Sequence, residues 1–139
     1  SAADAVIMAA AVADYRPAKK ALSKIKKTGS NAYLELRLVK NPDILEVLGR
    51  RKGNKILVGF ALETENLYEN ALKKLKTKNL DFIIANRLTK KQNIFGNGRT
   101  GVLIIDRSGG KKSMKNVSKG AVAEEIIKRL KTKLMKIKR

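Results

Sequence analysis

The chain has 139 residues and a formal net charge of +20, and it contains no cysteine and no histidine. This length suits one domain with a hydrophobic core. The missing residue types exclude disulfides, thiolate nucleophiles and the commonest zinc ligand. No apolar run approaches the roughly 20 residues that cross a bilayer, and the first residues lack the basic start of a signal peptide. We therefore expect a cytoplasmic protein without a membrane partner.

The excess of positive charge has two interpretations. An anionic partner, either a nucleic acid or a polyphosphate, would explain it. A lysine-rich, cysteine-free composition of the kind found in proteins from hot environments would also explain it. The excess is spread over much of the chain rather than gathered in one tail. Its local arrangement is therefore more informative than its sum.

The first third of the chain predicts two strands separated by a long loop. Residues 4–11 are an apolar run that predicts a buried strand, ending at small residues just before Asp14. Residues 12–31 lack apolar periodicity and carry five lysines, a pattern typical of a lid or binding loop. Residues 33–39 alternate apolar and polar side chains, which predicts a strand with one solvated face.

A strong helix start follows at Asn41-Pro42-Asp43. Asparagine is a favoured cap, proline suits the first helical position, and aspartate complements the positive helix end. We expect residues 49–54 to end this helix. Its predicted inward face consists of Ile44, Leu45 and Leu48.

The rest of the chain alternates strands with helices. The expected strands are residues 55–60, 81–85, 101–106 and 111–116, the last two forming a hairpin around residues 108–110. A polar loop through Lys90, Lys91, Gly96 and Gly98 precedes that hairpin. The expected helices are residues 66–77, with Leu67, Ala71, Leu72 and Leu75 on the core side, and about 118–139, with Val122, Ile126, Leu130 and Leu134. We expect Ser118 to cap the last helix and its tail to fray beyond Glu125. The alternation predicts an α/β fold, a Rossmann-like three-layer sheet with helices on both faces plus a β-hairpin.

Three features of the sequence suit an anionic ligand. Lys24-Ile25-Lys26-Lys27 gathers ammonium groups whose repulsion a bound anion would relieve. The helix start at residues 42–45 offers free amides for phosphate oxygens. Lys74 and Lys78 lie four residues apart on one helical face. Each also has an ordinary explanation, since lysines favour solvated surfaces and every helix has such an amino end.

Phe60 and Asp14 are the other two candidates. The Phe60 ring ends a predicted strand, where it could pack on a nucleobase or ribose, or close the hydrophobic core. Asp14 could hold a ribose hydroxyl or a Mg²⁺ ion bridging phosphates. Alternatively, it could form an ion pair with Arg16 or Lys19.

Six ordered blocks, AAAVADYRP, KIKK, VKNPDIL, VGFALET, KLKTKNLDFIIAN and SKGAVAEEI, make the chain resemble bacterial phosphopantothenoylcysteine synthetase over nearly its whole length. That activity is usually the carboxyl-terminal half of a bifunctional decarboxylase/synthetase of coenzyme A biosynthesis. The resemblance implies a CTP-dependent ligase that joins 4′-phosphopantothenate to L-cysteine through an acyl-cytidylate, releasing CMP and pyrophosphate. The absence of histidine and cysteine fits, because the substrates supply the nucleophiles while the protein aligns and neutralises phosphates.

The resemblance also implies a set of site residues. Lys24 matches the family's catalytic lysine, which would stabilise charge on the α-phosphate and acyl oxygen. Asp14 matches the nucleotide-binding acid and is the candidate ligand for Mg²⁺. The other nucleotide contacts carried over are Met8, Ala9, Ala10, Pro42, Asp43, Ile44, Leu45, Phe60, Lys74 and Lys78.

The chain departs from the family pattern in three ways. Leu62 stands where the family often has alanine, and Arg87 stands where aspartate is common. Family members also have upstream strands with a glycine-rich segment and an asparagine that serves the acyl-cytidylate step. The resemblance therefore implies that residues 1–139 are the latter part of a single synthetase domain and are inactive alone. The missing part is the amino-terminal half, to which a flavin decarboxylase can be fused.

The family is dimeric, so the resemblance implies a homodimer in which the lysine loop, about residues 16–31, acts as a flap near the subunit boundary. A basic nucleic-acid-binding module is the alternative reading of the charge. Three tyrosines, three phenylalanines and no tryptophan are few for base stacking. We therefore expect no nucleic-acid partner.

Overall fold

The computed structural model describes residues 3–26, 33–87 and 98–137. Its contacts divide the chain into two units. The first, here called the sheet unit, comprises Ser1–Ala9 and Ile44–Arg139, and the second, the ribbon unit, comprises Ala10–Asp43. Of the predicted lysine loop, residues 27–31 lie outside the described residues, as does the predicted polar loop except for Gly98.

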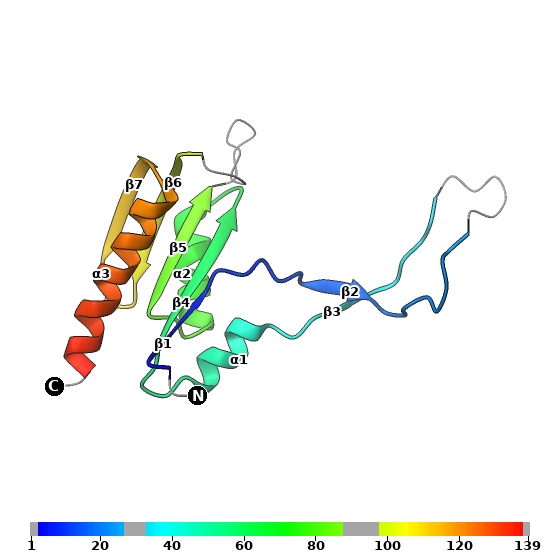
Figure 1. Cartoon of the computed structure of the whole chain (residues 1–139), viewed down its shortest axis with the longest axis horizontal. Helices are drawn as coiled ribbons and strands as arrows, with labels where there is room; N and C mark the ends of the chain where they lie inside the picture. The colour runs from blue at the N-terminus through cyan, green and yellow to red at the C-terminus, as the bar shows by residue number, and fades with distance from the viewer. Residues whose placement is uncertain (1–2, 27–32, 88–97, 138–139) are drawn as a thin grey trace. The chain divides into compact units, whose positions relative to one another are not determined.

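The sheet unit is built on five strands in the order β1-β4-β5-β6-β7 (Figure 1). The strands are β1 (Ala5–Met8), β4 (Ile56–Glu63), β5 (Phe82–Arg87), β6 (Thr100–Asp106) and β7 (Lys111–Val117). The first three run parallel to one another, and β6 and β7 are antiparallel to their neighbours. The helices are α1 (Ile44–Arg51), α2 (Leu67–Thr77) and α3 (Lys119–Ile137).

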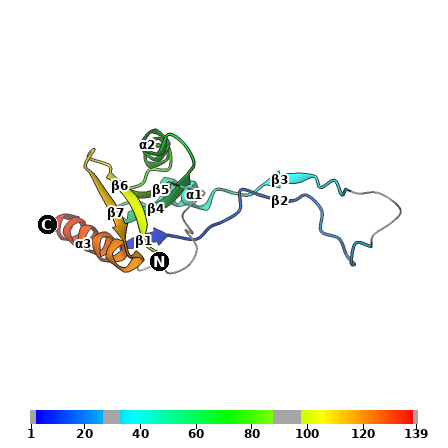
Figure 2. The same ribbon diagram turned by 90° about the horizontal axis from the view of Figure 1, so that it is seen from above.

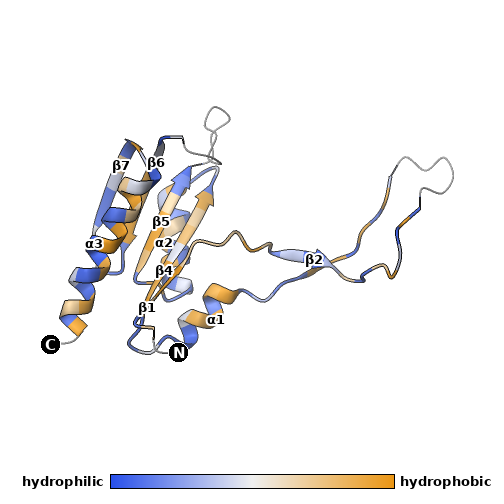
Figure 3. Ribbon diagram, viewed as in Figure 1, coloured by the Kyte–Doolittle hydropathy of each residue, from blue (hydrophilic) through white to orange (hydrophobic). Residues whose placement is uncertain are grey.

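Helices cover both faces of this sheet, and Figure 2 shows the strands between α3 and α2. Successive strand residues point to opposite faces, so Ile56 packs toward α3 and Leu57 toward α1 and α2. The core stripes of α2 and α3 pack on the sheet as their spacing predicts. In Figure 3, β4 and β5 carry the apolar colouring while the edge strand β7 is largely hydrophilic. The predicted Rossmann-like three-layer fold with a hairpin is confirmed.

Several predicted boundaries were wrong. The first strand ends at Met8 rather than residue 11 and lies at a sheet edge, so it is only half-buried. Strand β4 continues past Phe60 to Glu63. Helix α3 does not fray beyond Glu125, because it is continuous to Ile137. Its predicted cap is confirmed, since the Ala121 N–H donates to Ser118 Oγ at 3.1 Å. Among the described helices, none combines the length and the apolarity that a bilayer crossing requires.

Gly49 does not end α1, as the sequence had suggested; it lies buried inside that helix. A β-carbon at this position would stand 2.0 Å from the Lys78 carbonyl oxygen. The Asn79 side chain donates to the Gly49 carbonyl at 2.7 Å. Close packing of α1 against the end of α2 therefore requires glycine here. Ile44, predicted to face inward, is 44% exposed, which leaves Leu45 and Leu48 as the packed residues.

Asp81 joins elements on both sides of the sheet. Its carboxylate accepts hydrogen bonds from Lys52 Nζ at 2.6 Å and the Leu57 N–H at 2.8 Å, and it pairs with Lys133 Nζ on α3 at 3.0 Å. Burial raises the pKa of this carboxyl, but the hydrogen bonds outweigh burial and hold the pKa below its ordinary value of 3.8. Asp81 therefore stays ionised inside the protein.

The ribbon unit contains two short antiparallel strands, β2 (Tyr15–Pro17) and β3 (Leu38–Lys40). Two further backbone bonds extend the pairing, from Ala18 N–H to the Arg37 carbonyl and from Asn41 N–H to the Asp14 carbonyl. The strand predicted over residues 33–39 is wrong for residues 33–36, which are exposed and belong to no strand, and Arg37 joins the pairing only through its carbonyl. The loop predicted over residues 12–31 is wrong at Tyr15–Pro17, which form β2, whereas the described residues 18–26 are irregular, as predicted.

Candidate functional site

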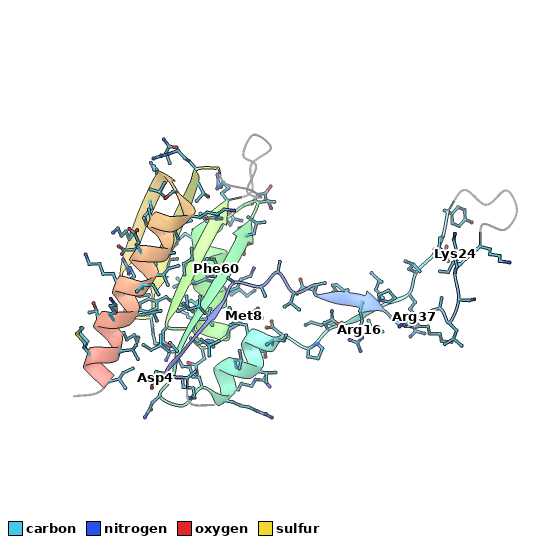
Figure 4. All side chains as sticks on the ribbon, viewed as in Figure 1. Asp4, Met8, Arg16, Lys24, Arg37 and Phe60 are labelled. Carbon is cyan, nitrogen blue, oxygen red and sulfur yellow. The ribbon has the colours of Figure 1, made fainter. Side chains whose placement is uncertain are left out.

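The carboxyl ends of β1, β4 and β5 meet at one edge of the sheet, because these three strands are parallel. Met8 aligns with Gly59 on β4, and Glu63 aligns with Arg87 on β5. In open α/β sheets, ligands bind at this edge. Met8 and Ala9 of the predicted set lie here, and Phe60 follows Gly59 on the neighbouring strand (Figure 4).

Helix α3 leaves one face of the sheet uncovered at this edge. Ile56 and Val58 are buried on the α3 side of β4, but Phe60, two residues further, is 41% exposed. Leu62, next on the same face, is 44% exposed. The interpretation of Phe60 as a core residue is therefore wrong. Two large apolar side chains instead present a surface on which a planar ring can pack.

Asn86 belongs to the same face, although it was absent from the predicted site. It aligns with Leu62 across β4 and β5, and its Nδ2 donates to Thr100 Oγ1 at 3.1 Å. Its Oδ1 atom is buried and has no partner among the described residues. An unpaired buried acceptor costs about 1–3 kcal/mol, so such a group marks a place where a ligand donor would be favourable. The only sequence signal is an asparagine at the end of the apolar stretch DFIIAN.

Lys74 is held at the end of β4 by an ion pair. Its Nζ lies 2.6 Å from Glu63 Oε1, and Asn70 Nδ2 donates to the other Glu63 oxygen at 3.1 Å. Lys74 is therefore not a merely solvated helix lysine. Lys78 follows one turn later at the carboxyl end of α2, where its carbonyl oxygen faces Gly49. The structure brings Lys74, but not the Lys78 backbone, to the carboxyl edge of the sheet.

Asp14 in the ribbon unit does not form the ion pair that was its alternative role. Among the described residues, no ion pair joins it to Arg16 or Lys19; its carbonyl accepts from the Asn41 N–H at 2.8 Å. The Arg16 guanidinium binds Asn41 Oδ1 at 2.8 Å and the Lys40 carbonyl at 3.2 Å. The exposed Asp14 carboxylate is thus available to a ligand.

Asn41 does not cap α1, contrary to the sequence prediction. Its Nδ2 donates to the Ala13 carbonyl at 2.7 Å, and the helix begins at Ile44. Asn41 therefore closes the base of the ribbon. Pro42 and Asp43 precede the helix, whose first two residues are Ile44 and Leu45. These four residues therefore still flank the start of a helix, but the helix begins two residues later than the sequence predicts.

Lys24 is exposed in the ribbon unit (Figure 4), and its side chain forms no hydrogen bond or ion pair with another described residue. Ala10 opens the same unit and is also exposed. Lys27 of the predicted cluster lies outside the described residues. The convergence of Lys24 and Asp14 with the sheet edge on one triphosphate stays a prediction.

A three-layer α/β sheet whose parallel strands end at a partly apolar edge that α3 does not cover is a Rossmann-like ligand-binding fold. Residues 1–134 match the family model described as the DNA/pantothenate metabolism flavoprotein C-terminal domain, and the chain belongs to that family. The predicted resemblance to the synthetase region is therefore confirmed as membership of this family.

The curated relatives of the chain include proteins named coenzyme A biosynthesis bifunctional protein CoaBC. The one from Borreliella burgdorferi is 46% identical over 125 residues, covering 88% of this chain and 30% of the relative. The one from Bacillus subtilis is 40% identical over 129 residues, covering 93% of this chain and 31% of the relative. The chain thus spans about a third of these relatives. A crystal structure of the C-terminal domain of such a CoaBC protein is 34% identical, with a TM-score of 0.70, over 96% of this chain and 56% of that one.

Proposed function

We propose that the chain is part of a ligase of coenzyme A biosynthesis that joins 4′-phosphopantothenate to L-cysteine with CTP. The observation that carries this proposal is the sheet edge that α3 does not cover, where Phe60 and Leu62 are exposed and Asn86, aligned with Leu62, has a buried Oδ1 atom without a partner among the described residues. Family membership and the names of the relatives support it. The identity of the nucleotide as CTP and the location in the cytoplasm stay predictions.

In this proposal the substrate carboxylate attacks the α-phosphate of CTP, forming an acyl-cytidylate and releasing pyrophosphate. The cysteine amine then attacks the acyl carbon, the amide bond forms, and CMP leaves. The protein positions the reactants and offsets developing negative charge. The exposed Lys24 ammonium would contact the α-phosphate, while Phe60 packs on the nucleoside and Lys74, oriented by Glu63, contacts a phosphate. The amides of Ile44 and Leu45 at the start of α1 would receive phosphate oxygens.

Mg²⁺ fits this arrangement only if phosphate oxygens of the substrate supply some of its ligands. Within residues 3–26, 33–87 and 98–137, no group of three acidic, histidine or cysteine side chains could hold a metal ion. Mg²⁺ commonly binds one or two carboxylates plus phosphate oxygens and waters. Asp14 would supply that carboxylate, and the ion would reduce the charge of the triphosphate.

The ribbon unit supports the proposal of a homodimer. Its apolar side chains are exposed at Val12, Tyr15, Leu22, Ile25, Tyr33, Leu34, Leu36 and Leu38. A two-stranded ribbon with so little buried surface is marginal on its own, so a second copy would cover these side chains. We expect light scattering to give a dimer for the chain and a monomer for Leu36→Ser/Leu38→Ser. The control Ile127→Ser, exposed on α3, should remain dimeric; a monomeric wild type contradicts the proposal.

The test of the ligase uses a chimera in which this chain replaces the matching residues of the Bacillus subtilis relative. CTP-dependent, cysteine-dependent release of pyrophosphate is measured for wild type, Lys24→Gln and Lys20→Gln. Both lysines are exposed in the same ribbon, so the variants lose equal charge. We expect turnover to fall about 100-fold for Lys24→Gln and little for Lys20→Gln, with unchanged thermal unfolding. Equal rates for the two variants contradict the role of Lys24.

Nucleotide binding by the chain itself separates the ligase from the nucleic-acid alternative. Calorimetric titration with CTP and Mg²⁺ should show saturable binding, and CTP should protect the segment around Lys24 from proteolysis. Steeply salt-dependent RNA or DNA binding without CTP affinity would favour the nucleic-acid module.

A further inference from the structure

A cavity of about 600 Å³ lies between α3 and the turn that joins β6 to β7. Phe82, the first residue of β5, and Asp106, the last of β6, help line it and lie opposite each other in the sheet. The cavity is therefore at the amino end of β5, while Asn86 and the proposed nucleotide edge lie at its other end. A strand rises about 3.3 Å per residue, so about 13 Å of strand separates Phe82 from Asn86.

Cations outnumber acids around this cavity. Its cationic lining consists of Arg107, Lys128, Arg129, Lys133 and Lys136. Asp106 and Glu125 are the acidic lining residues, and both are already engaged. Asp106 accepts from the Ser108 N–H and hydroxyl, and Glu125 pairs with Lys112 and Arg129.

Much of the positive charge has no acidic partner of its own. Lys133 shares Asp81 with Lys52. The Arg107 guanidinium donates to neutral groups, the Leu80 carbonyl and Asn79 Oδ1. Among the described residues, no ion pair engages Lys128 or Lys136. Cations held together without counter-charge repel one another, and a bound anion relieves that repulsion.

We propose that this cavity is a second oxyanion site, which binds pyrophosphate either free or as part of a small phosphorylated molecule. The volume lies within the range of small-molecule pockets. Ammonium and guanidinium groups form charge-assisted hydrogen bonds with phosphate oxygens. The Phe82 ring, with Lys133 Nζ 5.4 Å from its centroid, adds apolar lining for an organic part. This site goes beyond the proposed ligase and does not depend on it.

The experiment follows backbone amide resonances of the ¹⁵N-labelled chain at about 0.15 M ionic strength, where surface attraction is strongly screened. Inorganic pyrophosphate and ADP are titrated separately. We expect saturable shifts at Arg107, Lys128 and Thr132 with at least one probe. The tighter probe identifies whether the phosphates are recognised free or on an organic molecule.

Matched variants test whether the cavity itself binds. Removing two phosphate contacts with Lys128→Gln/Lys136→Gln should weaken the tighter probe at least tenfold. The control Lys73→Gln/Lys119→Gln removes the same charge from exposed positions outside the cavity and should leave affinity unchanged. Unsaturable shifts, shifts confined to the surroundings of Phe60, or equal weakening in both double variants would overturn the proposal. The resonances of Phe60 and Asn86 report on the proposed nucleotide edge. A failure of nucleotide binding at that edge is therefore distinguishable from a failure of pyrophosphate binding in this cavity.

Discussion

Replacing Asp81 by asparagine tests how the buried carboxylate stabilises the sheet unit. Asparagine has nearly the same shape and still offers an oxygen to the Leu57 N–H, so the change removes mainly the negative charge. The Lys52 side chain, only 10% exposed, then loses its partner, whereas Lys133 is 31% exposed and better solvated. Leaving a buried charge unpaired costs about 3–5 kcal/mol. We take the lower end, about 3 kcal/mol, because the second lysine can reach water.

Urea unfolding followed by circular dichroism at pH 7 measures this loss. The control is Glu46→Gln, which breaks the exposed pair with Arg50 and should cost only about 0.3–0.5 kcal/mol. The pKa of Asp81 is lower in the folded state than its ordinary 3.8. Its contribution to the free energy of unfolding is therefore present above pH 3.8 and is lost as the pH falls through the folded value. A loss equal to that of Glu46→Gln, or one that does not shrink as the pH falls below 3.8, refutes the reasoning.

Three further substitutions and one control substitution have expected outcomes. Gly49→Ala places a methyl group against the Lys78 carbonyl and should lower the free energy of unfolding in urea by about 2–3 kcal/mol. Its control is Gly53→Ala, where the backbone has φ +54° but the space around the new methyl group is open. The control should lower the free energy of unfolding by about 1 kcal/mol. Ile126→Ala opens a cavity between α3 and the sheet and should cost about 3 kcal/mol, and a value under 1 kcal/mol would mean that α3 packs loosely. Phe60→Ala should leave stability within about 1 kcal/mol, since the ring is 41% exposed, yet weaken CTP binding by at least tenfold in calorimetry; unchanged affinity removes Phe60 from the site.

The order of the strands and helices follows from local patterns in the sequence. Apolar spacing of three and four residues predicts α2 and α3, because that spacing places one stripe of side chains on the core. The turn around Ser108-Gly109-Gly110 predicts the β6–β7 hairpin, where Gly109 has φ +90°. These features depend on neighbours in the chain, so local sequence is enough to find them.

The candidate site was only partly predictable. The resemblance located Phe60 and Lys74, but the exposure of Phe60 depends on where α3 stops covering the sheet. Asn86 was missed because an unpaired oxygen is a property of its surroundings, not of its residue type. Asn41 has the sequence of a helix cap and instead bonds Ala13, 28 residues away.

The amino-acid sequence by itself determined the kind of fold, through the alternation of apolar runs and amphipathic stretches, and it limited the chemistry by lacking cysteine and histidine. Only the tertiary structure decided which glycine had to be glycine and which acid had to be buried. Gly49 meets the end of α2, and Asp81 meets Lys52, Leu57 and Lys133. These contacts join residues 24 to 52 positions apart along the chain, and packing of the complete sheet and its helices brings them within a few ångströms.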